Sequence, residues 1–134
     1  ISIVTEPFAD RILWHNRKWT AEVLVNILEN AVKYTSPGGS ITIRVRSTEM
    51  YTEIAVQDTG RGIRPEELTE IFKRFYRSKD VENLEGSGMR LYLSRLILER
   101  EKGYLTASSV PGEGSTFSVF LQNCQNLNQN LSGE

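Results

Sequence analysis

Two asparagines and a lysine recur at helical spacing near residue 30, and their side chains could hold a metal ion and a phosphate. Asn26, Asn30 and Lys33 follow one another at intervals of four and three residues, so they share one stripe of a predicted helix. Mg²⁺ favours oxygen ligands and keeps phosphates and waters in its shell, so the Asn30 carboxamide oxygen is a candidate ligand. Lys33 could reach a phosphate as a point charge. Taken alone, such a stripe is more typical of a solvated helix face.

A carboxylate stands at the end of a predicted strand, in the motif DTGRGI. Asp58 has the parity of Ile54 and Val56, so we expect it to face the same side of the sheet as these apolar residues. A carboxylate in that position is costly unless it is hydrogen-bonded, and it could accept from an exocyclic amine such as N6 of adenine. Gly60 and Gly62 would let a flat base approach closely, because neither has a Cβ. Alternatively, the strand has already ended and Asp58 caps the following turn.

A Gly-Ser-Gly run at residues 86–88 precedes a third amphipathic segment. Backbone N–H groups at the start of a helix, with glycines before them, form an anion site. The run is not a Walker A motif, because no Gly-Lys-Ser or Gly-Lys-Thr follows it, and a simple flexible loop is the alternative. Combined with the asparagine stripe and the strand-end carboxylate, it predicts one ATP site assembled from three separated segments.

The surrounding sequence predicts the elements that would position these segments. Apolar residues at helical spacing predict helices over 20–34, from Pro65 to Phe75, and from Met89 to a stop at Gly103. Alternation predicts strands at 41–46, 51–58, 105–109 and 116–121, with an edge strand over residues 1–8. We therefore expect an α+β fold, a two-layer α/β sandwich with about three helices packed on one face of a mixed sheet of about five strands.

Length and composition set the remaining limits. The 134 residues suggest one domain over 1–121, followed by a polar tail at 122–134 that we expect to be disordered. A net charge of −1 gives no reason to expect a nucleic-acid partner. Cys124 and His15 are the single cysteine and histidine, so neither an internal disulfide nor a cysteine- or histidine-rich metal site is expected. No apolar run predicts direct membrane insertion, although the start at Ile1 suggests a piece of a longer protein.

In this order, the segments resemble the ATP-binding catalytic domain of bacterial sensor histidine kinases, a group that shares its superfamily with gyrase, the ninety-kilodalton chaperone and MutL. The resemblance covers about 19–121. The motifs that carry it are LVNILENAVKYT at 24–35, similar to the N box, DTGRGI at 58–63, similar to the first glycine box, IFKRFYR at 71–77, similar to the phenylalanine box, and GEGSTF at 112–117, similar to the closing glycine turn.

The resemblance implies cofactors and a role for each matching residue. The cofactors would be ATP and Mg²⁺, with Asn30 as the metal ligand and with Asn26 and Lys33 at the phosphates. Residues 77–88 would form the lid over ATP. The other implied nucleotide contacts are Tyr34, Asp58, Gly60, Gly62, Ile63, Tyr76, Gly86, Ser87, Gly88, Met89, Arg90 and Thr116.

The implied activity is transfer of the γ-phosphoryl group of ATP to a histidine on a separate dimerisation domain of the same kinase. A response regulator would act downstream, and the domain would lie in the cytoplasmic part of a membrane-bound sensor. The family's phosphoacceptor helix is not present in this chain, and the sequence around His15 does not resemble it.

Two other functions stay open. A gyrase-type or chaperone-type ATPase uses a glutamate to activate water at the position of Asn26, and asparagine cannot act as a general base, so transfer is favoured over hydrolysis. The second alternative is a degenerate docking module that binds nucleotide weakly. It rests on Arg90, which stands where the family's second glycine box, Gly-x-Gly-Leu-Gly-Leu, has its last glycine.

Overall fold

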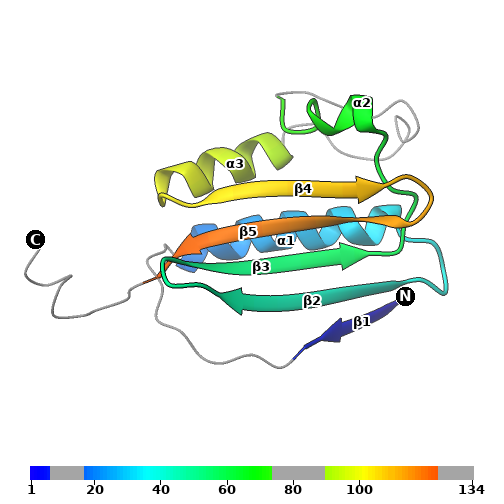
Figure 1. The fold of residues 1–134 in the computed structure, drawn as a ribbon, viewed down its shortest axis with the longest axis horizontal. Coiled ribbons are helices and arrows are strands. Elements are labelled where there is room, and N and C mark those ends of the chain that lie inside the picture. Colours follow the sequence, from blue (N-terminus) through cyan, green and yellow to red (C-terminus); the bar gives the residue numbers. More distant parts are fainter. Residues whose placement is uncertain (7–16, 74–89, 124–134) are drawn as a thin grey trace, which may run out of the picture.

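The computed structural model describes residues 1–6, 17–73 and 90–123, which form a single five-stranded sheet covered by helices (Figure 1). The elements are β1 (Ser2–Thr5), α1 (Arg17–Tyr34), β2 (Ser40–Ser47), β3 (Tyr51–Asp58), α2 (Pro65–Leu68), α3 (Arg90–Arg100), β4 (Tyr104–Val110) and β5 (Gly114–Gln122). The strand order is β1-β2-β3-β5-β4. Because β1 runs parallel to β2 and every other pair is antiparallel, the sheet is mixed, as predicted.

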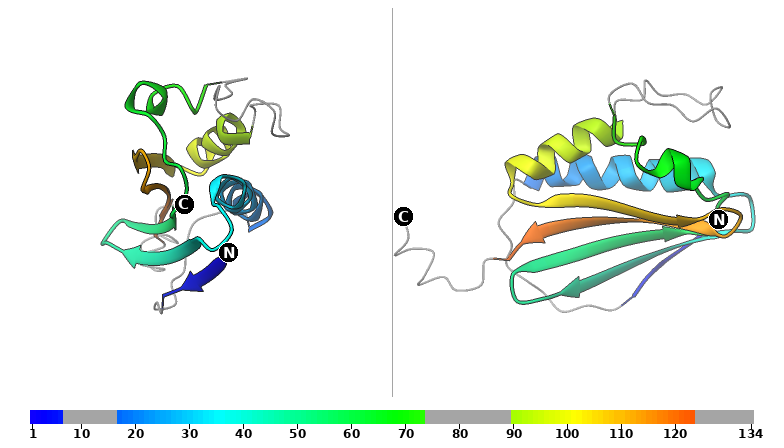
Figure 2. Two further views of the ribbon diagram at one scale, coloured as in Figure 1. Left: turned by 90° about the vertical axis from the view of Figure 1, so that its right-hand side faces the viewer. Right: turned by 45° about the horizontal axis from the view of Figure 1, so that its top comes forward.

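Helices α1 and α3 lie side by side on one face of the sheet, and the short α2 lies beside β4 (Figure 2). The helical spacing of Leu93, Leu96 and Ile97 predicts the inner face of α3, but Leu93 and Leu96 are 43% and 38% exposed, and Leu98 is buried instead. Elsewhere the core between the layers follows the predicted faces: apolar residues of α1 meet alternate residues of the strands. Its buried members are Val23, Ile27, Ala31, Ile41, Val56, Ile71, Leu98, Leu105, Phe117, Val119 and Leu121. The predicted fold class is therefore confirmed.

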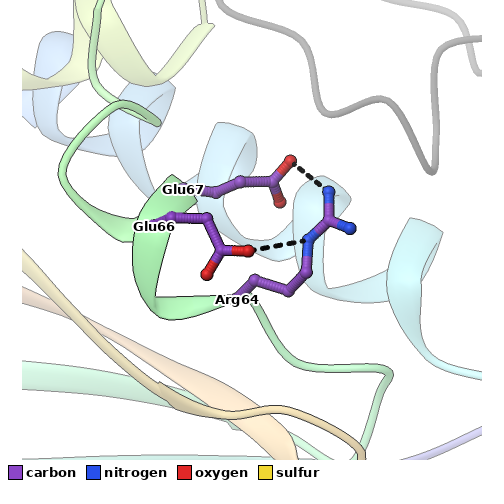
Figure 3. Close-up of polar contacts among 3 residues, drawn as sticks. All are labelled: Arg64, Glu66 and Glu67. Atoms are coloured by element: carbon purple, nitrogen blue, oxygen red, sulfur yellow. Dashed lines mark hydrogen bonds and ion pairs between the residues drawn. The ribbon is translucent and has the colours of Figure 1, made fainter.

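The second helix is much shorter than predicted. Pro65 occupies its first turn, as expected, and the Arg64 guanidinium lies between the carboxylates of Glu66 and Glu67, 3.0 Å from the latter (Figure 3). The helix ends at Leu68 and does not continue toward Phe75, which lies outside the described residues. Turns follow instead, and two of their side chains pack on the sheet: Ile71 enters the core, and Phe72 packs edge-on against Phe117.

The third helix ends shortly before Gly103, as predicted, although Gly103 is not the left-handed residue at its end. The residue with the left-handed backbone is Lys102, at φ 61°, although glycine is the usual choice for that conformation. Gly103 donates its N–H to Leu98 O at 2.8 Å and lies directly against β5. A Cβ at Gly103 would be 2.1 Å from Phe120 O, so a glycine is needed there for close packing.

The sheet extends slightly past the predicted domain boundary at Leu121. Strand β5 runs to Gln122, and Asn123 is buried, with its carboxamide accepting from Thr52 Oγ1 at 2.6 Å and donating to Thr48 O at 2.8 Å. The described fold therefore includes Asn123. The predicted disorder of the tail concerns residues 124–134, which lie outside the described part of the chain.

Candidate functional site

The polar stripe of α1 passes from the interior to the surface toward the C-terminal end of the helix. Asn26 is only 8% exposed, Asn30 is half-buried, and Lys33 is exposed. Figure 1 shows that this end of α1 lies at the same end of the molecule as the end of β3, whereas α3 begins nearer the middle of the molecule. At Asn26, therefore, the stripe is not a solvated face. The C-terminal end of α1 and the motif after β3 lie at one end of the molecule, whereas residues 86–88 lie outside the described part of the chain.

Asn26 connects the two long helices. Its Nδ2 donates a hydrogen bond to Ser94 Oγ on α3 at 3.2 Å, and Ser94 is fully buried, with 0% exposure. A buried amide needs such a partner. Sequence reasoning did not single out Ser94. The available signal was a small polar residue among apolar ones on the third predicted helix, between Leu91 and Leu98.

Asp58 is 3% exposed, and its carboxylate is hydrogen-bonded by the chain itself. Oδ1 accepts from the N–H of Gly60 at 2.8 Å and from the N–H of Ser115 at 3.3 Å, and Oδ2 accepts from Ser115 Oγ at 2.9 Å. The strand continues through Asp58, and its carboxylate also caps the following turn. Because each carboxylate oxygen can accept two hydrogen bonds, Oδ2 keeps acceptor capacity for a ligand donor.

Ser115, and not Thr116, is the β5 residue beside Asp58. In the register of β3 with β5, Ser115 is opposite Asp58, whereas Thr116 is opposite Gln57. Successive residues of a strand face opposite sides, so Thr116 faces away from the helix layer. Sequence reasoning named Thr116 and missed Ser115, although the inward-facing Phe117 has the parity of Ser115.

The glycines that follow Asp58 are needed by the protein's own packing. A Cβ on Gly60 would lie 2.2 Å from Tyr34 O at the end of α1. Gly62 has φ +75°, which favours glycine, and a Cβ there would lie 2.5 Å from Val110 O. These contacts explain both glycines without a ligand, and their predicted contact with a base remains a prediction.

Two further candidate residues, Tyr34 and Ile63, contact the turn after β3 or form part of it. The Arg61 guanidinium stands over the ring of Tyr34, 5.1 Å from its centroid, which is a cation–π geometry. Ile63 is partly buried against the core, and its N–H donates to Ser109 Oγ at 2.6 Å. The turn after β3 is thus connected both to α1 and to β4.

The third predicted segment is described only at its end. Arg90 is the first residue of α3, as expected for a helix that begins near Gly88. The other predicted contacts on that side lie outside the described residues, and they are Tyr76, Gly86, Ser87, Gly88 and Met89. The predicted lid at 77–88 lies outside them too.

The donor set suits a metal that arrives with other ligands. Within residues 1–6, 17–73 and 90–123, no group of three or more His, Cys, Asp or Glu side chains could hold a metal ion. Asn30 alone offers one amide oxygen, and Mg²⁺ commonly combines such a single protein ligand with phosphate oxygens and waters. In the same part of the chain, no helix is long and apolar enough to cross a membrane.

Comparison with known proteins decides the family. Residues 15–125 match the family described as "Histidine kinase-, DNA gyrase B-, and HSP90-like ATPase". The chain belongs to this family, whose domain is termed HATPase. The match runs from before α1 to just past the end of β5, so it includes the asparagine stripe, Asp58 and the β4–β5 turn. Membership of a family of ATPases implies that the domain binds ATP.

Relatives of this HATPase domain are sensor proteins. The sensor histidine kinase RppB of Synechocystis is 36% identical over 110 residues, which are 81% of this chain and 24% of RppB. The sensor protein SrrB of Staphylococcus aureus is 35% identical over 102 residues, which are 75% of this chain and 18% of SrrB. The chain therefore spans a quarter or less of the length of these relatives.

Solved structures share the fold. The HATPase domain superposes on the mycobacterial sensor histidine kinase MprB with a TM-score of 0.78 at 24% identity, covering 91% of this chain and 82% of that one. It superposes on full-length ShkA, solved in complex with AMPPNP, with a TM-score of 0.77 at 20% identity, covering 92% of this chain and 26% of ShkA. At this level of identity the likeness establishes the architecture.

Proposed function

We propose that this HATPase domain binds Mg-ATP and transfers its γ-phosphoryl group to a histidine on a separate dimerisation domain of the same kinase. A response regulator would then receive the signal. Because ATP and response regulators are found in the cytoplasm, the domain would act there as part of a longer sensor protein. The proposal is supported by the family, by one relative named a sensor histidine kinase and another named a sensor protein, and by the position of the ends of α1 and β3 at one end of the sheet.

The observation that carries the proposal is the state of Asn26. Gyrase-type and chaperone-type ATPases, which this domain resembles, have at this position a glutamate that activates water. Here the side chain is buried, and its amide donates to Ser94 Oγ at 3.2 Å. An amide held in this way has no proton-accepting role toward water, and this favours transfer to an acceptor brought in by another domain.

The base and the metal would be bound by different elements. Asp58 would accept from the adenine amine with the remaining capacity of Oδ2, with the backbone turn of Gly60 and Gly62 beside it. Asn30 would give Mg²⁺ its single protein oxygen, and Lys33 would contribute charge near the phosphates. Magnesium would neutralise phosphate charge during transfer, while the residues of the chain hold and orient the nucleotide.

The test is a transfer assay with γ-labelled ATP. We expect no acid-labile label on the isolated chain, because its one histidine, His15, precedes the helix with the nucleotide ligands and phosphoryl transfer needs an acceptor in line. Label should appear on an added dimerisation domain of the same kinase, but not on that domain when its phosphoacceptor histidine is replaced by glutamine. Replacing Asn30 by alanine should abolish the label on the added domain.

Two outcomes would contradict the proposal. Stoichiometric label on His15 would show that the chain carries its own acceptor. Steady release of inorganic phosphate without any acceptor would favour the ATPase alternative.

A further inference from the structure

The turn after β3 is held by the hairpin of β4 and β5. The turn, residues 59–64, lies beside the β4–β5 connection at one end of the sheet (Figure 1). The N–H of Gly112 donates to Arg61 O at 2.8 Å, which joins the two backbones directly. A Cβ on Gly114 would lie 2.0 Å from Asp58 O, so the hairpin backbone also packs tightly against the start of the turn.

One side chain makes two further connections at this junction. Ser109 Oγ accepts from the N–H of Ile63 at 2.6 Å and donates to Gly114 O at 2.9 Å. Because a hydroxyl has one proton, the second bond directs its lone pairs toward Ile63. The single hydroxyl of Ser109 therefore fixes the far end of the turn relative to the hairpin.

The near end of the turn is fixed by the neighbouring strand. Ser115 is opposite Ser109 in the β4–β5 register, and it binds the Asp58 carboxylate through both its N–H and its hydroxyl. Asp58 and Ile63 are thus held by two facing residues of one hairpin. The distance and tilt between the carboxylate and Ile63 depend on both attachments.

We propose that Ser109 is a positioning residue for nucleobase recognition, which acts through Ile63 and the turn. This inference rests on the proposed function, because it takes Asp58 and the turn as the adenine-binding surface. Hydrogen-bond selection between bases requires the base to lie in the plane of the Asp58 carboxylate. Without the Ser109 hydroxyl, the N–H of Ile63 and the carbonyl of Gly114 both lose a partner, and the turn can move away from that plane.

The experiment compares Ser109→Ala with Ser108→Ala. Ser108 is the adjacent residue on β4, is exposed, and faces the opposite side of the sheet, so the two variants make the same chemical change in one strand. Dissociation constants for Mg-ADP and Mg-GDP are measured by calorimetry, well below the unfolding temperature of each variant. We expect Ser109→Ala to weaken Mg-ADP binding about tenfold and to reduce the preference for ADP over GDP, because the part-buried N–H of Ile63 loses its partner. Ser108→Ala should bind both nucleotides as the parent does.

A second variant separates positioning from simple loss of packing. Ser109→Cys keeps a side chain of the same shape, with a somewhat larger terminal atom, but replaces the hydroxyl by a poor hydrogen-bonding group, so it should lose base selectivity as Ser109→Ala does. Ser109→Thr keeps the hydroxyl and suits a strand, so it should restore the preference for ADP.

The outcomes are distinct for each idea. Unchanged selectivity between ADP and GDP in Ser109→Ala and Ser109→Cys would overturn the inference, and so would failure of both variants to fold, because the hydroxyl would then serve the fold itself. A parent chain that binds neither nucleotide would overturn both the inference and the proposed function. A parent chain that binds Mg-ADP selectively but transfers no phosphoryl group would defeat only the kinase proposal.

Discussion

Replacing Asp58 by asparagine separates base recognition from folding. The carbonyl oxygen of asparagine can keep both hydrogen bonds that Oδ1 now accepts, from Gly60 N–H at 2.8 Å and Ser115 N–H at 3.3 Å. The new amide group would replace Oδ2, and the Ser115 hydroxyl can rotate so that it accepts instead of donating. Alanine is less informative at this position, because it would leave all of these donors unpaired.

The expected loss falls on adenine binding. The position that would accept from the N6 amine becomes a donor, so two donors oppose each other in a buried site. A hydrogen bond to a charged group contributes about 1.5–3 kcal/mol, which corresponds to roughly 10- to 160-fold weaker binding of Mg-ATP. Guanine carries a carbonyl oxygen at the same place, so binding of Mg-GTP should stay the same or improve.

The assay is a pair of calorimetric titrations with Mg-ATP and Mg-GTP, together with thermal unfolding of each variant. Glu53→Gln is the matched control, since it removes the same charge from β3 on the opposite face of the strand. We expect the ATP preference of the parent to be lost in Asp58→Asn and kept in Glu53→Gln. An unchanged ratio of ATP to GTP affinity in Asp58→Asn would refute the role of Asp58.

Two further substitutions test the helices around the site. Arg90→Gly should tighten Mg-ATP binding, because we expect the bulk of arginine to hinder the close approach of phosphate to the backbone. In addition, a cation at the start of a helix is unfavourable by about 0.3–1 kcal/mol. The nucleotide-free form should lose some stability, since glycine is a poorer helix residue than alanine by about 1 kcal/mol. Unchanged or weaker binding would instead identify Arg90 as a phosphate contact. Ser94→Ala should lower the free energy of unfolding by about 1–3 kcal/mol, because the buried Asn26 amide loses its partner. Denaturant titration measures this free energy, and a loss no larger than that of the exposed Ser108→Ala control would contradict the prediction.

The sequence predicted the sheet well, because each strand repeats a simple alternation. The inward parity of Ile54, Val56 and Asp58 follows from local pattern alone, and the structure confirms that Val56 and Asp58 are buried. The helical spacing of Asn26 and Asn30 was equally local. Where the face that a residue occupies depends on residues near it in the sequence, the local pattern was sufficient to predict that face.

Features that depend on distant contacts could not be predicted. The helix expected from Pro65 to Phe75 ends at Leu68, because packing of Ile71 on the sheet outweighs the local periodicity. The structural role of Gly60 could not be predicted for the same reason. A side chain there would collide with the carbonyl oxygen of Tyr34, which is far away in the sequence. Such approaches of one backbone to another leave no periodic signal.

The partners of the site residues were the hardest to predict. Ser94, Ser109 and Ser115 each hold a residue or turn of the candidate site, and serine is too common in any sequence to stand out by type. Their identification needs the strand register and the contact between α1 and α3. The burial of Asp58 was thus predictable from local pattern, whereas the residues that orient Asn26, Asp58 and the turn were not.

Calorimetric titration of the parent chain with Mg-ATP tests the central claim most directly. The account predicts saturable binding that is weaker without Mg²⁺, because Asn30 would contact the phosphates through the metal. Binding of Mg-GTP should be weaker still, because Asp58 would select adenine. Affinity should be modest in the presence of Arg90. The absence of saturable Mg-ATP binding at about 1 mM, the upper end of typical substrate affinities, or equal affinity for Mg-GTP, would contradict the account.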